Sequence, residues 1–368
     1  MQDKKKSLLI ITNLYPVPWG RNRASFNKQQ FDLIAQDIPV KIVILLTWKE
    51  WLSHRNLCHS TNEIKYCPYF YIPKVGRRLV PFFQFFSLMF LIPWMKKQQV
   101  SALLASWGFP DAVAASMVNK FLRLPFFVKV HGTDVNENIK FSGRTRLMRY
   151  WLNKAERIFC ASKALADELS QRGIDKSKVL VNYNGVNPEI FYPAETKLQR
   201  QSFVFVGSLI TTKGVNELLS AAIICKAKYP DITLDILGEG PMKSTLIDKI
   251  NEYNLNDSIK LHGSVSLPCV AEFIRNAKVL VLPSYREGVP NVLLESFACG
   301  TPVIATRVGG IPEVVNKDVG ILIDDRDSKQ LANAMIESLN KDWCSEKILA
   351  HARQFDWHKN VRRVMDEI

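Results

Sequence analysis

Residues 281–315, VLPSYREGVPNVLLESFACGTPVIATRVGGIPEVV, contain the pattern that decides the fold. The apolar run at 278–283 predicts a strand buried on both faces. Pro290 begins a predicted helix and Gly300 ends it, because proline fits the first helical turn and glycine favours the position after the last one. Residues 302–305 predict the next strand, and a second helix follows. This alternation of strand, loop and helix predicts a parallel sheet.

Two carboxylates lie in this stretch, after the first strand. Glu287 is in the loop and Glu295 is more than one turn into the helix, on a face that can turn back toward the loop. Open parallel sheets bind ligands at this end of their strands, where helix N-termini attract phosphate. Carboxylates accept hydrogen bonds from sugar hydroxyls, so a ligand with a sugar and a diphosphate would suit the site. The alternative is a plain βαβ unit with solvated glutamates.

The same stretch resembles a known family. Glu287 and Glu295, with seven residues between them, stand in EGVPNVLLESFACGTPVIAT, and GGIPEVV follows. This string is similar to the signature of retaining glycosyltransferases of family 4. The resemblance implies an α/β protein of GT-B fold, in which two Rossmann-like parallel-sheet domains face a cleft. We expect an acceptor-binding domain at 1–198, with a helix at 355–368 crossing back to it, and a nucleotide-sugar-binding domain at 199–354.

The function implied by the resemblance is glycosyl transfer with retention. The enzyme would move a sugar from a nucleoside-diphosphate sugar to a hydroxyl of a glycan or lipid-linked acceptor, in cell-surface polysaccharide biosynthesis. Two alternatives stay open. One is a GT-B sugar-nucleotide epimerase, and the other is an inactive protein that binds a sugar nucleotide.

The resemblance also implies roles for residues of the donor site. Glu287 is expected to be catalytic and to accept hydrogen bonds from the transferred sugar, and Glu295 from the ribose. Backbone N–H groups of Gly288 and Val289, together with Lys213, are expected to stabilise the departing diphosphate.

A second glycine-bearing loop, from Gly207 to Gly214, follows a predicted strand at 203–206. Such a loop can hold a diphosphate through its N–H groups and through Lys213. Family members usually carry arginine after the first glycine, whereas this chain has Ser208, so another cation would have to replace that arginine. Because no DxD-like pair of carboxylates accompanies the donor site, we expect neither a metal nor a cofactor.

Two predicted acceptor-side elements lie in the first half of the chain. The turn from His131 to Asp134 follows a predicted strand, and the resemblance implies that His131 lies near the anomeric carbon and is catalytic, with Asp134 nearby. A proline-rich loop ending in Gly20 and Arg21 corresponds to the family's glycine loop at the cleft. A structural histidine and an ordinary loop are the alternatives.

The 368-residue chain carries its excess positive charge in its first half. Residues 1–195 hold 28 Lys and Arg against 14 Asp and Glu, and residues 196–368 hold 21 of each, which sums to 49 and 35. A basic half favours an anionic membrane surface or a phosphate-bearing acceptor. Nucleic acid is not expected, because no nucleic-acid-binding motif accompanies the charge. Seven scattered cysteines without metal-ligand spacing favour a reducing cytoplasm.

The most apolar segment, residues 79–95, predicts contact with a membrane. As one helix its 17 residues would span about 26 Å, short of a hydrocarbon core of about 30 Å. One alternative is a helix buried in the first domain. The aromatic residues and the paired cations on both sides favour a helix lying in the bilayer interface. We therefore expect a cytoplasmic protein, peripheral at the inner face of the membrane. The groups concerned are Phe82, Phe83, Phe85, Phe86, Trp94, Arg77, Arg78, Lys96 and Lys97.

Overall fold

The computed structural model of the protein describes residues 6–20, 23–71, 76–195 and 201–368. The chain divides into two compact units, residues 1–184 with 357–368, and residues 185–356. This division assigns the described residues 185–195, which fall within the expected first domain (1–198), to the second unit. Residues 355–356, expected at the start of the helix crossing back, lie there too.

The first unit is built on a parallel sheet that has seven strands within the described residues. Its middle strands are runs of apolar residues buried on both faces, as in Leu8–Thr12 and Phe126–Val130. The strand order is β3-β2-β1-β4-β5-β6-β7. The strands are β1 (Leu8–Thr12), β2 (Val40–Thr47), β3 (Ile64–Tyr69), β4 (Ala102–Ser106), β5 (Phe126–Val130), β6 (Arg157–Cys160) and β7 (Val179–Val181).

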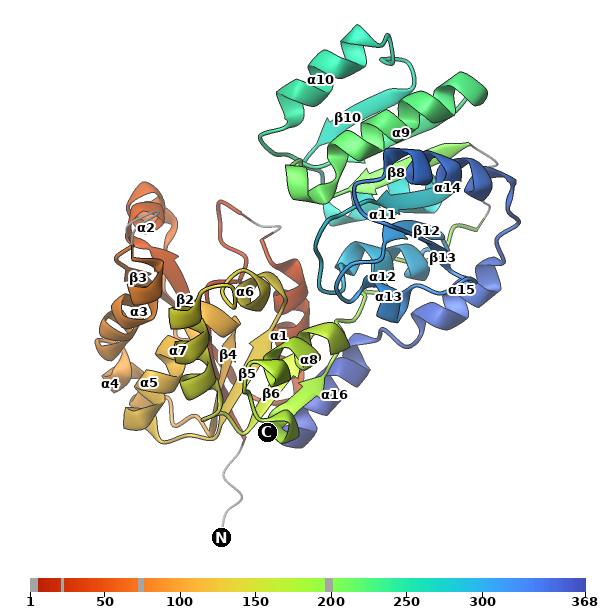
Figure 1. Cartoon of the computed structure of the whole chain (residues 1–368). Coiled ribbons are helices and arrows are strands. Elements are labelled where there is room, and N and C mark those ends of the chain that lie inside the picture. The colour runs from red at the N-terminus through yellow and green to blue at the C-terminus, as the bar shows by residue number, and fades with distance from the viewer. Residues whose placement is uncertain (1–5, 21–22, 72–75, 196–200) are drawn as a thin grey trace. The chain divides into compact units, whose positions relative to one another are not determined.

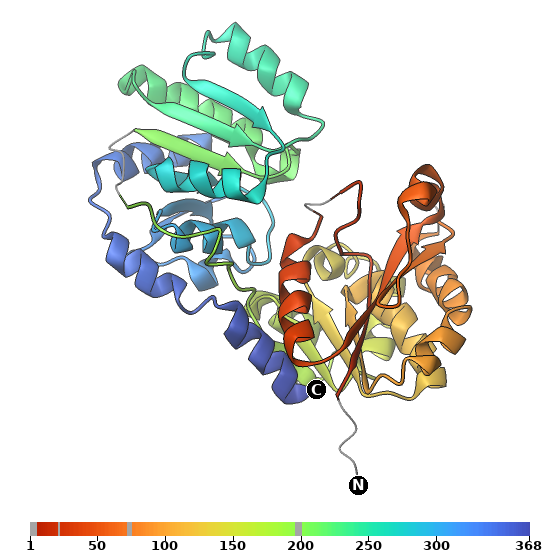
Figure 2. The same ribbon diagram turned by 180° about the vertical axis from the view of Figure 1, so that it is seen from behind.

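Helices cover both faces of this sheet (Figures 1 and 2). Figure 2 shows α1 and α16 side by side on one face, where Phe31, Ile34, Val361 and Val364 share a core with the sheet. Helices α3, α5 and α7 lie on the other face. The helices are α1 (Ser25–Asp37), α2 (Trp48–His54), α3 (Val80–Met89), α4 (Ile92–Lys97), α5 (Val113–Leu122), α6 (Thr133–Asn136), α7 (Ser142–Leu152), α8 (Lys163–Gln171) and α16 (Trp357–Glu367).

The apolar segment 79–95 forms two helices, α3 and α4, instead of the single helix considered from the sequence. Pro93 lies in the first turn of α4, and in a continuous helix its ring would clash with the carbonyl of Met89. Residues such as Leu88 and Met95 pack into the core. Phe82, Phe83, Phe85 and Trp94 are half-buried, whereas Phe86 and Phe90 are 62% and 86% exposed. Among the described residues we find no helix with the length and hydropathy of a membrane-spanning segment.

The second unit is a smaller parallel sheet, with six strands among its described residues in the order β10-β9-β8-β11-β12-β13. Its strands are β8 (Ser202–Val206), β9 (Thr233–Leu237), β10 (Ile259–Gly263), β11 (Val279–Leu282), β12 (Val303–Thr306) and β13 (Gly320–Ile323). Its helices are α9 (Val215–Lys228), α10 (Lys243–Glu252), α11 (Leu267–Asn276), α12 (Asn291–Ala298), α13 (Ile311–Val314), α14 (Ser328–Asn340) and α15 (Ser345–Ala352). Figure 1 shows α9 and α14 together on one face.

The unit β11–α12–β12–α13 confirms the strand and helix order predicted from residues 281–315. Pro290 precedes the first residue of α12, and Gly300 follows its end in a left-handed conformation. Strands β11 and β12 are parallel neighbours, so the two following loops lie at the same edge of the sheet.

Candidate functional site

Three loops meet at the carboxyl edge of the second sheet. The loop after β8 approaches the loop after β11 so closely that a Cβ on Gly214 would lie 2.0 Å from the carbonyl oxygen of Pro283. The loop after β12 approaches it as well, because a Cβ on Gly309 would lie 1.8 Å from the oxygen of Glu287. Both glycines have positive φ angles, which other residues adopt only at a cost. Glycine at these two positions thus lets the loops assemble into one site.

Lys213 and Glu287 face each other across two of these loops. The ammonium group of Lys213 donates a hydrogen bond to Oε1 of Glu287 at 2.5 Å. Their side chains are 25% and 12% exposed, so the pair is largely shielded but reachable by a ligand. The sequence predicted both residues at the donor site, and the structure brings them together.

Glu295 lies on α12, and its carboxylate is held in a poorly solvated position. Burial raises the pKa of Glu295 to about 7. Among the described residues, no side chain donates a hydrogen bond to this carboxylate. Its acceptor capacity is therefore available for hydroxyl groups of a ligand.

The remaining predicted donor residues lie on the same loops. Gly288 accepts a hydrogen bond at 2.9 Å from the backbone N–H of Gly310, and the side chain of Val289 is buried at the start of α12. Gly207 follows β8, and Ser208 after it is exposed. The hydroxyl of Ser208 therefore occupies a surface position at the place where family members usually have arginine.

One contact near these loops was missed from the sequence. Tyr285 hydrogen-bonds to the side chain of Glu217, and burial followed by this hydrogen bond raises the pKa of Tyr285 to about 12. The backbone N–H of Tyr285 also donates to the oxygen of Thr212 at 2.8 Å. The tyrosine thus ties the loop of Glu287 to the loop of Lys213. The spacing of these residues in the sequence contains no signal of this contact.

His131 follows β5 directly, as predicted, and belongs to the first unit. A hydrogen bond of 3.1 Å joins its Nε2 to the hydroxyl of Ser106, and its Nδ1 has no partner among the described residues. Phe26 and Trp107 flank the ring at centroid distances of 5.2 and 5.9 Å. Burial lowers the pKa of His131 well below its usual value, and the charge of Lys129 adds to this. The imidazole is therefore neutral at pH 7.

Asp134 supports the turn that carries His131. Its carboxylate is fully buried and accepts hydrogen bonds from the N–H groups of Gly108, His131 and Gly132 at 2.6, 3.0 and 2.7 Å. Asp134 therefore supports the turn, and its carboxylate oxygens already accept hydrogen bonds from backbone N–H groups. Burial raises the pKa of this carboxyl.

Gly20 closes a short turn with Val17, through a hydrogen bond of 2.9 Å from its N–H. The loop around it is held by Glu50, which accepts hydrogen bonds from Trp19 at 3.2 Å and from Arg23 at 2.6 Å. Arg21, which we predicted beside Gly20, lies outside the described residues.

A buried lysine on β5 is a feature that sequence reasoning missed. Lys129 is 2% exposed, and its ammonium donates hydrogen bonds to Gln30 at 2.7 Å and Asn27 at 3.2 Å. It also lies over the rings of Phe26 and Trp357. Burial lowers the pKa of Lys129 to about 7. Residues 126–130 predict an apolar strand that contains one lysine. The sequence pattern does not indicate that polar side chains of α1 lie beside that lysine.

Within the described residues, no group of three or more His, Cys, Asp or Glu side chains is arranged to hold a metal ion. The expectation that neither a metal nor a cofactor takes part stays a prediction.

Two family models match the chain and together span most of it. Residues 30–190 match the model described as Glycosyltransferase Family 4, and residues 187–362 match the model described as Glycosyl transferases group 1. The two matches meet close to the boundary between the two compact units.

Individual proteins are similar over most of the chain. An uncharacterized glycosyltransferase of Methanocaldococcus jannaschii is 29% identical over 285 residues, which cover 74% of this chain and 77% of that protein. A Bacillus subtilis glycosyltransferase named for teichuronic acid biosynthesis is 29% identical over 273 residues, covering 70% and 67%. The Anabaena protein HepE, solved in complex with UDP, matches 98% of both chains with a TM-score of 0.74 at 17% identity. This last similarity shows the GT-B fold.

Proposed function

The chain belongs to the family 4 and group 1 glycosyltransferases, and from this premise we propose a specific reaction. The enzyme moves a sugar from a nucleoside-diphosphate sugar to a hydroxyl of a glycan or lipid-linked acceptor, with retention of configuration. The observation that carries the proposal is the Lys213–Glu287 pair at the meeting point of three loops. It provides one cation for a diphosphate and one carboxylate for sugar hydroxyls, side by side.

In this proposal the loops of the second unit bind the diphosphate, which is the leaving group of the reaction. Lys213 and the N–H groups of Gly288 and Val289 stabilise the negative charge that grows on the leaving oxygen in the transition state. Gly207 and Ser208 contact the same phosphates through their backbone. The Anabaena protein HepE, which was solved with UDP and with UDP-glucose, supports a nucleoside-diphosphate sugar as the donor.

The two glutamates divide the recognition of the donor between them. Glu287 accepts hydrogen bonds from the transferred sugar, and its proximity to Lys213 places it beside the phosphate end of the donor. Glu295 accepts hydrogen bonds from the ribose. Its lack of a side-chain partner and its raised pKa (about 7) support this role, because two ribose hydroxyls would supply the donors that the carboxylate lacks.

On the first unit, His131 is the proposed contact to the reacting sugar. Its unpartnered Nδ1 and its neutral ring support a role as a hydrogen-bonding group instead of a charged one. Asp134 positions this turn from beneath, and Gly20 with Arg21 contributes to acceptor binding.

We further propose that the acceptor is processed at an anionic membrane surface, in cell-surface polysaccharide biosynthesis. The relative named for teichuronic acid biosynthesis, the basic first half of the chain and the exposed Phe86 and Phe90 support this. Vesicle co-sedimentation tests it. The protein should pellet with anionic vesicles at low salt, and less so after Arg77→Glu with Arg78→Glu. Protein that stays in the supernatant at low salt contradicts the membrane proposal.

The reaction itself is tested by calorimetry and by product analysis. Nucleoside diphosphates are titrated into the full chain, and each matching nucleotide sugar is then incubated with candidate acceptors, with and without EDTA. We expect binding of one nucleotide, transfer that persists in EDTA, and the donor's anomeric configuration in the product. Conversion of the donor without any acceptor would identify an epimerase. Binding without turnover of any donor would identify a sensor.

A further inference from the structure

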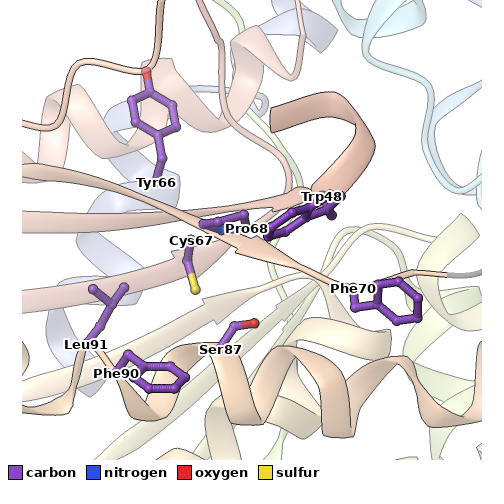
Figure 3. Close-up of a pocket in the computed structure, with 8 residues that line it drawn as sticks. All are labelled: Trp48, Tyr66, Cys67, Pro68, Phe70, Ser87, Phe90 and Leu91. Atoms are coloured by element: carbon purple, nitrogen blue, oxygen red, sulfur yellow. The ribbon is translucent and has the colours of Figure 1, made fainter. Parts of the chain in front are cut away.

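An apolar groove lies at the free edge of the first sheet, away from His131 and its supporting turn. Figure 3 shows edge strand β3 above and the end of α3 below, with Cys67, Ser87 and Leu91 between them and aromatic side chains around them. Its volume is about 680 Å³, within the range of about 300–1,000 Å³ typical of ligand pockets. The lining residues are Trp48, Tyr66, Cys67, Pro68, Phe70, Ser87, Phe90 and Leu91.

The break between α3 and α4 gives the groove its lower wall. The chain turns after Met89, and Figure 3 shows Leu91 pointing toward the strand while the ring of Phe90 lies across the end of α3. Phe90 is 86% exposed, and Phe70 and Trp48 at the rim are 53% and 50% exposed. Exposed aromatic side chains of this size mark a surface that is stabilised when an apolar partner covers it, because apolar area is then removed from water.

The chemistry of the lining selects a hydrocarbon. Among the described residues no charged side chain lines the groove. Ser87 contributes a hydroxyl on the α3 side, whereas the hydroxyl of Tyr66 points away from α3 (Figure 3). The thiol of Cys67 is buried, which raises its pKa to about 12, so it remains a small neutral group. A polar ligand would leave its own groups without partners here.

The chain segment that forms most of the groove has a positive net charge. Residues 64–110, which supply every lining residue except Trp48, contain no Asp or Glu and six Lys or Arg residues. Lys65 belongs to β3 itself, next to Tyr66 of the lining, and its ammonium lies 5.8 Å from the ring of Trp94. An apolar groove with a lysine next to its lining, on a segment of positive net charge, is complementary to an amphiphile with a hydrocarbon chain and an anionic head.

We propose that this groove binds the hydrocarbon chain of a lipid-phosphate acceptor, one molecule at a time. The inference rests on the proposed function and specifies its acceptor class. A second copy of the chain, pairing with β3, fits less well, because Pro68 lies within the strand and has no N–H to donate to a partner strand. A seated chain would lower the acceptor's KM without taking part in the chemistry.

Dodecyl phosphate, kept below its micelle concentration, is the probe for a calorimetric titration of the full chain. Phe90→Ser removes an exposed wall residue, and Ser87→Trp fills the groove. Phe86→Ser is the matched control, since Phe86 is exposed on the same helix but does not line the groove. Melting curves of all variants confirm that they fold.

We expect one dodecyl phosphate per chain, with affinity reduced at least tenfold by Phe90→Ser and by Ser87→Trp and changed less than twofold by Phe86→Ser. Inorganic phosphate at equal concentration should not bind, and UDP should bind all variants alike. If UDP binds but dodecyl phosphate does not, the groove proposal fails while the proposed donor site stands. If dodecyl phosphate binds but UDP does not, the groove proposal stands and the proposed donor site fails. Equal affinity of all variants for dodecyl phosphate also overturns the proposal. So does a protein that binds no dodecyl phosphate but forms a dimer that Phe90→Ser abolishes.

Discussion

Replacing Lys213 by methionine removes the ammonium group that we propose holds the diphosphate, while keeping most of the apolar stem. A hydrogen bond to a charged group contributes about 1.5–3 kcal/mol. Since about 1.4 kcal/mol corresponds to a factor of ten, the Kd for UDP should rise about 10- to 140-fold. Titration calorimetry measures this directly. Lys347→Met is the control, because Lys347 forms an exposed ion pair with Asp318 in the same unit.

The structure also predicts how Glu287 modifies this loss. In Lys213→Met the Glu287 carboxylate, 12% exposed, would have no cation beside it and would repel the diphosphate. The double variant Lys213→Met with Glu287→Gln should therefore bind UDP more tightly than Lys213→Met alone, by at least about threefold, or about 0.7 kcal/mol. An unchanged Kd in Lys213→Met would refute the reasoning, and another cation would then hold the phosphates.

Three further predictions concern the glutamates, the buried lysine and the loop glycine. Glu287→Gln should chiefly lower kcat, and Glu295→Ala should chiefly raise the donor KM; small, equal effects in steady-state kinetics would contradict the assignment. Lys129 has a folded-state pKa of about 7, below its unfolded value, so wild-type stability should rise with pH between about 7.5 and 9.5. Relative to Lys129→Met, the gain in urea unfolding should be about 1.4 kcal/mol per pH unit, and parallel pH curves would argue against a neutral lysine. Gly214→Ala should destabilise the second unit by at least about 2 kcal/mol, and an unchanged urea midpoint would show that the loops can move apart.

The second unit could be predicted well from the sequence because local signals agreed with one another. The apolar strand before Pro283, the proline before α12 and the glycine after it are short-range features, and each acts on the nearest residues. Glu287 and Lys213 were recognised through their motifs. Their direct contact depends on how closely two loops pack, and the role of Gly214 in that packing is visible only when Pro283 is placed beside it.

The first unit was harder to predict where its contacts are long-range. Residues 47–78 contain α2 and the edge strand β3. Apolar and polar residues alternate only weakly along β3, because β3 lies at the edge of the sheet beside β2. Segment 79–95 resembled one continuous helix, since its composition is apolar except for Gln84 and Ser87 and only Pro93 marks the break. Lys129 lies in an apolar strand, and its partners Asn27 and Gln30 are about a hundred residues away in the sequence.

Helix α16 has a consequence for the order in which the protein folds during translation. It contributes Val361 and Val364 to a core with α1, and Asn360 bonds to Gln30 and to the oxygen of Tyr183. Residues 185–356, which form the other unit, are synthesised in between, and at about 5–20 residues per second these 172 residues take about 10–35 s. During that interval, the surface of α1 that α16 later covers stays open on the nascent chain. The second unit can therefore finish folding before the first, and deleting residues 357–368 should unfold the unit that is made earliest.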